Sequence, residues 1–252
     1  MQKPLLLLTL FFISIINYAQ DTTTVLFKKA EAFEYKQKGQ EALNIYKQIL
    51  SIQPDNIKAL VKTTEVTCFL GDSLQTKPEK YKAYETALQF AQKAVAADSN
   101  SAIAYYALSL VNNRMIPVET DNKKLAACIK NAKQYADKAL LLDPKNAMAN
   151  FIEGKWHYDM ESFSQVKKAA LKTFYAKFAE PDLDTAIQYF ERSKSTDPYF
   201  MFNNFLLAKA YKQNNNLTKS IEMLNRVTKL PIRRSNDVGI KEEAKQLLQD
   251  LQ

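Results

Sequence analysis

The stretch AKQYADKALLLDPKN, residues 132–146, contains a spacing that recurs along the chain and decides the fold. Ala132 stands twelve positions before Pro144, and Ala136 stands eight positions before it. The same two offsets, counted back from three other residues that close an apolar run, find small or aromatic residues: Ala42 and Tyr46 before Pro54, Ala87 and Ala91 before Ser99, and Ala186 and Phe190 before Pro198. Because both offsets match four times, the sequence predicts one repeated structural unit.

The residue types at these positions suit pairs of antiparallel helices. Two helices approach closely only where one of them carries a small side chain, which alanine supplies. A proline after the second helix cannot continue that helix, but it fits the first turn of the next one. The spacing resembles the tetratricopeptide repeat, whose helix-turn-helix units carry such an alanine, a ring and a closing proline. The predicted fold class is therefore all-α, an α-α superhelix.

Five helix pairs can be placed on the chain, within one helical repeat domain over residues 21–252. The predicted pairs are 24–36 with 40–52, 56–70 with 78–97, 102–115 with 122–142, 147–158 with 183–195, and 202–212 with 217–230. A further helix over 238–251 is expected to cap the open end of this solenoid. Only four glycines and eight prolines occur, which leaves little material for the many tight turns of a β-rich fold.

The fourth unit is longer than the others and predicts an inserted helix. Its excess residues carry apolar side chains every three or four positions, which would form one stripe along a helix: Phe163, Val166, Ala170, Phe174 and Phe178. We expect this helix to pack on the flank of the solenoid. A role in binding a partner or a membrane surface is the alternative.

Residues 1–20 have the plan of a secretory signal peptide. Lys3 precedes an apolar run from Leu5 to Ile16, and a short polar stretch ends at Gln20. The run would span about 18 Å as a helix, against about 30 Å for the hydrocarbon core of a membrane. The sequence therefore predicts cleavage after Ala19, export to the periplasm or the outside, and no transmembrane span in the mature chain. Retention of the segment as an anchor is the alternative.

The C-terminal two fifths of the chain carry a narrower likeness, in a series of short motifs: Gly154-Lys155-Trp156-His157-Tyr158, Glu180-Pro181, Ala186, Tyr189-Phe190, Asp197-Pro198-Tyr199-Phe200, Ala208-Lys209-Ala210-Tyr211 and Leu230-Pro231. In that order they resemble the regulator of microtubule dynamics family. The resemblance implies a tetratricopeptide-like protein that associates with microtubules or with an organelle membrane surface. It implies no catalytic residue.

Catalytic and metal-binding motifs are missing from the sequence. The chain has one histidine, two cysteines far apart, and no glycine-rich phosphate loop, so we predict no enzyme, no cofactor and no metal site. His157 is expected to be a hydrogen-bonded structural residue. A hidden active site would instead need a polar pocket around Trp156, His157 and Tyr158. Cys68 and Cys128 are interpreted as small buried side chains, and a disulfide between them stays open.

The remaining candidate for function is surface. Lys and Arg number 35 against 27 Asp and Glu, and no dense basic run or aromatic-basic motif indicates nucleic-acid binding. In tetratricopeptide solenoids the first helix of each pair lines the concave face. We therefore take as candidates the cationic, aromatic and polar residues of the predicted first helices, which would suit an acidic protein or peptide. These candidates are Lys62, Tyr106, Asn113, Arg114, Phe151, Lys155, Phe202, Phe205 and Lys209. The predicted function is an exported, non-enzymatic interaction scaffold, with no prediction of oligomeric state.

Overall fold

The computed structural model describes residues 22–174, 180–234 and 236–251, and within these ranges it contains helices and no strand. The first helix covers residues 22–35 and pairs with α2 (Gly39–Ile52). Four more pairs follow along the chain: α3 (Ile57–Asp72) with α4 (Lys77–Ala97), α5 (Ala102–Met115) with α6 (Asn122–Leu142), α7 (Ala147–Glu161) with α9 (Leu183–Thr196), and α10 (Met201–Gln213) with α11 (Leu217–Lys229). Two single helices complete the fold, α8 (Gln165–Phe174) and α12 (Asp237–Gln249).

The predicted solenoid is confirmed. All five helix pairs, the inserted helix and the C-terminal helix are present, and α12 packs on α11 and α10 as a cap would. Predicted signal-peptide residues 1–20 lie outside the described residues. Within the described ranges, no helix is both long enough and apolar enough to cross a membrane.

The residues at the two repeated offsets are buried between helices, as close helix packing requires. The four alanines twelve positions before each closing residue, and the four residues eight positions before it, are all fully buried: Ala42, Ala87, Ala132, Ala186, Tyr46, Ala91, Ala136 and Phe190. The second position carries a ring in the first and fourth units and alanine in the second and third, so the units fill the same space differently. The Phe190 ring lies directly against Gly154 of α7, whose missing side chain leaves room for it.

The turns between units explain why each new helix starts where it does. Asn56, Ser101 and Asn146 accept hydrogen bonds from the backbone N–H groups of Ala59, Ala104 and Ala149, which caps α3, α5 and α7. In the later turns, the Asn150 amide donates to the Pro144 carbonyl and the Asn204 amide donates to the Pro198 carbonyl. These bonds fix the turns that bring successive first helices side by side.

The inserted helix α8 packs on α6 and not over the concave face. Leu171 is buried in a cluster with Ile129, Trp156 and Met160, and Phe163 packs against the same cluster. Phe174 is 52% exposed, so the predicted apolar stripe was wrong at this position. The side chain of α8 that packs inward is Leu171, which was not part of the predicted stripe. Phe178 lies outside the described residues.

Candidate functional site

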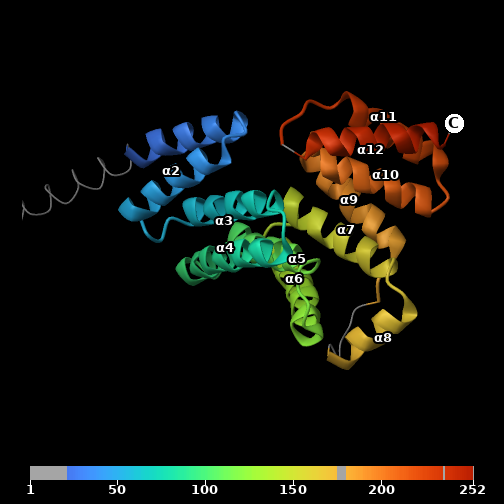
Figure 1. The fold of residues 1–252 in the computed structure, drawn as a ribbon, viewed down its shortest axis with the longest axis horizontal. Helices are drawn as coiled ribbons and strands as arrows, with labels where there is room; N and C mark the ends of the chain where they lie inside the picture. The colour runs from blue at the N-terminus through green and yellow to red at the C-terminus, as the bar shows by residue number, and fades with distance from the viewer. Residues whose placement is uncertain (1–21, 175–179, 235, 252) are drawn as a thin grey trace, which may run out of the picture.

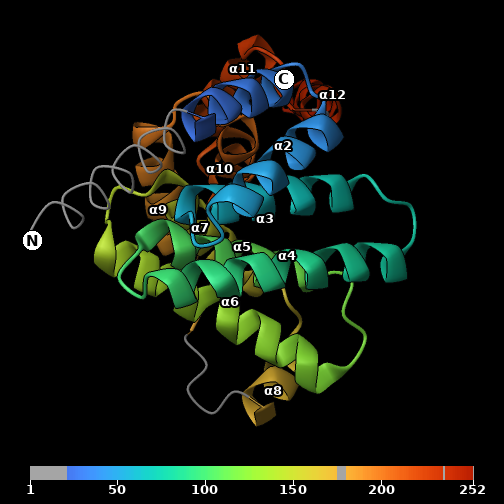
Figure 2. The ribbon, with the colours of Figure 1, turned by 90° about the vertical axis from the view of Figure 1, so that its left-hand side faces the viewer.

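A groove of about 630 Å³ lies on the concave side, where the two ends of the solenoid approach each other. One wall comes from Glu34 and Tyr35 at the end of the first helix, and the floor comes from α3 and α5. Arg233 and Arg234, in the loop between α11 and α12, form the opposite wall. Figures 1 and 2 show that loop facing the first helix pair across the opening of the superhelix. The groove therefore depends on the whole curved chain and on no single repeat.

Three of the predicted binding residues line this groove: Lys62, Tyr106 and Arg114. Lys62 forms ion pairs with Glu65 at 2.9 Å and with Glu34 at 3.6 Å, so the first and third helices are linked across the groove. Tyr106 is only 4% exposed and belongs to the groove floor. These three residues therefore lie together at the candidate groove, and their binding of a partner stays a prediction.

The other predicted residues lie elsewhere. Phe151 and Phe205 are buried in the core, where Phe151 packs edge-on against Phe200 with 4.6 Å between ring centroids. Asn113 is also buried, at 5% exposure, so these three side chains cannot reach a partner in this structure. A first helix contacts its own second helix and both neighbouring units, which leaves only a narrow strip for the concave surface.

Lys155, Phe202 and Lys209 remain at the surface or partly so, but they do not line the groove. Lys155 is paired with Asp159 one helical turn away. The Phe202 ring packs beside Phe151, and the Lys209 ammonium lies 5.4 Å from the centre of the Phe205 ring. Each is occupied by a neighbour on its own or the adjacent helix.

Lys62 and Arg114 already have carboxylate partners. Burial lowers the pKa of Lys62, but the carboxylates of Glu65 and Glu34 raise it by more, so the amine stays charged. The Arg114 Nε lies 3.2 Å from Asp72 Oδ1, and the Tyr84 hydroxyl donates to the same oxygen at 2.8 Å. These two cations therefore shape the groove more than they offer free charge to a ligand.

Arg233 and Arg234, which were not among the predicted binding residues, supply positive charge at the groove. Their guanidinium carbons lie 4.6 Å and 4.9 Å from the ring centres of Tyr199 and Phe200. In the part of the chain that the structure describes, no carboxylate lies within 4.0 Å of either guanidinium. Both side chains are exposed. Two cations that are held by rings and lack carboxylate partners can each bind a carboxylate from outside.

A buried carboxylate holds the arginine loop in place. The backbone N–H groups of Arg233 and Arg234 both donate to Asp237 Oδ2 at 2.8 Å, and Asp237 is 4% exposed. The loop is thereby fixed before a ligand arrives, which lowers the entropic cost of binding. The paired arginines between two predicted helices were a signal in the sequence, but their position opposite Lys62 depends on the curvature of the whole solenoid.

The region around Trp156 and His157 is packed. The Trp156 indole N–H donates to the Ile129 carbonyl at 3.2 Å. His157 is 7% exposed, and its Nδ1 accepts from the Asp182 backbone N–H at 3.2 Å. Burial and, to a smaller extent, the Lys133 charge together lower the pKa of His157 to about 4, so the imidazole is neutral at physiological pH. The expected structural hydrogen bond of His157 is therefore present.

Both cysteines are free thiols and both are buried. Burial raises the pKa of the Cys68 thiol to about 12 and that of Cys128 to about 11. Such thiols are unreactive toward oxidants and metals at neutral pH. Within residues 22–174, 180–234 and 236–251, no three His, Cys, Asp or Glu side chains gather in a way that could hold a metal ion.

A family model described as regulator of microtubule dynamics protein 1-3 matches residues 26–252. The chain belongs to this family. The likeness that the sequence motifs showed for the C-terminal two fifths therefore extends to almost the whole helical domain. It includes the first helix and the arginine loop that together form the groove.

Individual relatives in the family are distant. Regulator of microtubule dynamics protein 1 from Bos taurus is 28% identical over 190 residues, which are 73% of this chain and 57% of the relative. The protein of the same name from Caenorhabditis elegans is 27% identical over 117 residues, or 46% of this chain and 52% of the relative. The chain thus spans little more than half the length of these relatives.

Among solved structures, a thermophilic tetratricopeptide-repeat protein of Thermus thermophilus superposes with a TM-score of 0.64. The match covers 90% of this chain and 99% of the other, at 13% sequence identity. At that identity the likeness establishes a shared fold alone. This family member is thus a tetratricopeptide-like superhelix.

Proposed function

We propose that this chain is a non-enzymatic interaction scaffold whose concave groove binds an acidic segment of a partner protein. The observation that carries the proposal is the placement of Arg233 and Arg234 opposite Lys62 and Tyr106, with no carboxylate partner among the residues that the structure describes. The tetratricopeptide-like fold supports it, since such superhelices present extended concave surfaces to their partners.

The chemistry of the groove suits a peptide with alternating carboxylates and apolar side chains. A guanidinium binds a carboxylate with two parallel hydrogen bonds, and stacking on a ring limits the freedom that the arginine loses on binding. Tyr35, 87% exposed at the rim, and Phe69, on the lining, offer apolar contact. Rings and arginines are the residue types that contribute most energy in protein interfaces.

Compartment and biological role belong to the same proposal. The signal-peptide plan of residues 1–20 supports export, and a periplasmic or secreted scaffold follows from it. The names of the relatives support a second function, association with microtubules, and the family resemblance adds a membrane surface as a further alternative. Cosedimentation of residues 21–252 with polymer or anionic vesicles, lost at high salt, would favour this second function.

The groove is tested directly by binding a fluorescent peptide of about seven residues, alternating Glu with Leu, which extends roughly 24 Å. We expect saturable binding in low salt, followed by fluorescence anisotropy. Arg234→Glu should weaken it roughly tenfold, because one attraction is lost and one repulsion is added. The matched control is Lys47→Glu, an exposed lysine of α2 that lines neither of the cavities discussed here. Equal weakening by both variants, or no binding by the unmodified protein, would contradict the groove.

A further inference from the structure

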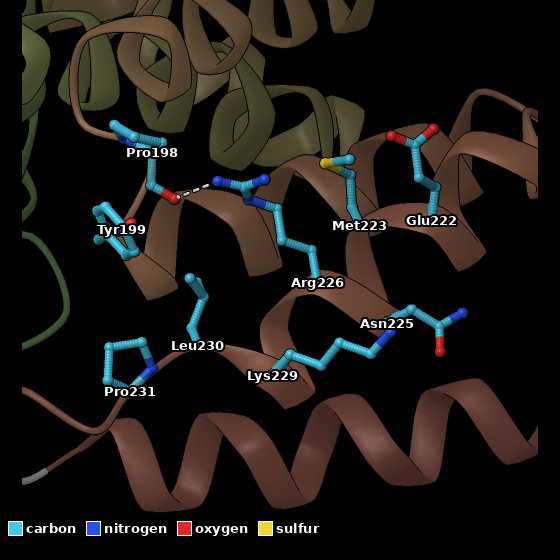
Figure 3. A pocket seen from close by; sticks show the side chains of 9 residues that line it. All are labelled: Pro198, Tyr199, Glu222, Met223, Asn225, Arg226, Lys229, Leu230 and Pro231. Carbon is cyan, nitrogen blue, oxygen red and sulfur yellow. Dashed lines mark hydrogen bonds between the residues drawn. The ribbon is translucent and has the colours of Figure 1, made fainter.

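A second cavity, of about 860 Å³, lies beside α11 on the other side of the arginine loop. Figure 3 shows its walls, which come from the turn before α10, from one face of α11 and from the start of the loop that carries the arginines. Pro198 and Tyr199 line this cavity, while Asp197 and Arg233 line the groove. Because Arg233 stacks on Tyr199, this one contact forms the border between the two cavities.

The second cavity combines apolar walls with positive charge. Met223 and Leu230 are almost fully buried beneath it, whereas Tyr199 is 49% exposed at its edge. Lys229 is exposed and forms no ion pair with any carboxylate in the described ranges. Such a surface offers one apolar pocket and one free ammonium next to it.

Arg226 makes the cavity rigid. Its Nη2 donates to the Pro198 carbonyl at 2.9 Å, which ties α11 to the turn before α10 (Figure 3). The Asn204 amide donates to the same carbonyl at 3.3 Å. Both walls are therefore held at a fixed separation before any ligand binds, as a preformed recognition site requires.

Glu222 is the one carboxylate among the residues that line this cavity. Figure 3 places Glu222 on the side away from Tyr199 and Pro231, with Arg226 and Lys229 between them. The positive end of the cavity therefore faces the arginine loop and the groove. This polarity favours a ligand carboxylate near Lys229 and disfavours one near Glu222.

We propose that the cavity beside α11 is a second subsite for the acidic segment, which crosses the Tyr199–Arg233 contact on its way from the groove. This inference rests on the proposed function and adds to it the path and the length of the ligand. The two cavities are lined both by cations, Arg233, Arg234 and Lys229, and by apolar side chains such as Phe69, Tyr199 and Leu230, which suits one extended chain bearing both kinds of side chain. A vesicle surface is too broad to enter a concave groove between the first helix and the loop.

Two labelled peptides of alternating Glu and Leu distinguish the subsites. One has about seven residues and the other about fourteen, which extend roughly 24 Å and 48 Å. We expect the long peptide to bind more tightly than the short one. Lys229→Glu should weaken binding of the long peptide about fivefold and leave the short one unchanged. Glu222→Lys should tighten binding of the long peptide about threefold, a gain that misfolding cannot produce.

The outcomes separate this inference from the proposed function. Equal affinity for both peptides, together with no effect of Lys229→Glu, would overturn the second subsite and leave the groove intact. Failure of the unmodified protein to bind either peptide would overturn the proposed function and the second subsite with it. A third outcome is that neither peptide binds, but the protein cosediments with vesicles of anionic phospholipid and Lys229→Glu reduces this cosedimentation. The positive surface would then bind a membrane, and the proposal would be overturned.

Discussion

Replacing Phe190 with alanine is expected to destabilise the protein by about 3–5 kcal/mol, because a large buried ring is lost and a cavity is left behind. The ring is fully buried between α7 and α9. Its neighbours are Gly154, the Phe151 ring at 6.1 Å between centroids, and the Tyr158 ring at 6.4 Å. Urea unfolding followed by circular dichroism measures the change in the free energy of unfolding.

Phe174→Ala is the matched control, because that phenylalanine is 52% exposed and its loss should change stability by no more than about 0.5 kcal/mol. The contact can also be tested from the other side. A Cβ added at Gly154 would lie 2.6 Å from Phe190 Cδ1, so Gly154→Ala should destabilise the protein by about 1–3 kcal/mol through overpacking. The higher helix propensity of alanine offsets up to about 1 kcal/mol of this cost. A cost below about 1 kcal/mol for Phe190→Ala would contradict the close packing of the fourth unit.

Replacing Lys133 with methionine is expected to cost about 2–3 kcal/mol at about pH 8, because the buried Glu153 must then either stay ionised without its cation or take up a proton. The Lys133 Nζ lies 3.0 Å from Glu153 Oε2, and the Glu153 side chain is fully buried. Among the described residues, Glu153 Oε1 has no hydrogen-bond partner. Lys133 also pairs with Asp137 and lies 5.5 Å from the centre of the Trp156 ring.

The cost of this substitution should depend on pH. Burial raises the pKa of Glu153 from 4.5 to about 7, although Lys133 lowers it. A raised carboxyl pKa means that the folded state favours the neutral acid, so this stabilisation is complete below about pH 4.5 and is lost as the pH rises through about 7. Without Lys133 the acid stays neutral to a higher pH. Lys133→Met should therefore cost only about 1–2 kcal/mol at about pH 5.

His157 has the opposite pH dependence and must be separated from Glu153. Its pKa is lowered from 6.5 to about 4, so its stabilisation is present above about 6.5 and is lost as the pH falls through about 4. Both proteins keep the burial that is the main cause of this shift, so the difference between variant and parent at each pH removes that part and retains only the smaller part due to Lys133. Lys82→Met, at an exposed lysine of α4, is the control. A cost of Lys133→Met that is the same at both pH values would contradict the buried ion pair.

The helix pairs could be predicted from the sequence because the information for them is local. Ala132 and Pro144 lie within one helix and its turn, and the distance between them fixes which residue faces the partner helix. The same holds for the start of α7, which was predicted at residue 147 and which Asn146 caps. Both features are determined by residues that are close together in the sequence.

The site could be predicted only in part, because it depends on how rotations between successive units accumulate. Lys62 and Arg234 are far apart in the sequence and meet only after the superhelix has curved. The choice of Asn113 and Phe151 failed for a related reason, since a first helix is covered on several sides by neighbouring units. Phe174 was placed inward because the true inward residue of α8, Leu171, was left out of the stripe.

Photocrosslinking from position 35 tests most directly whether the two ends of the superhelix form one binding groove. Tyr35 is exposed on the wall opposite the arginine loop, so a benzoylphenylalanine placed there reports a ligand held between the walls. We predict that it captures the long acidic peptide, that Arg234→Glu abolishes the capture, and that the same probe at Lys82 on the outer helix α4 captures none. Equal capture from positions 35 and 82, or capture from position 35 that persists in Arg234→Glu, would contradict the account.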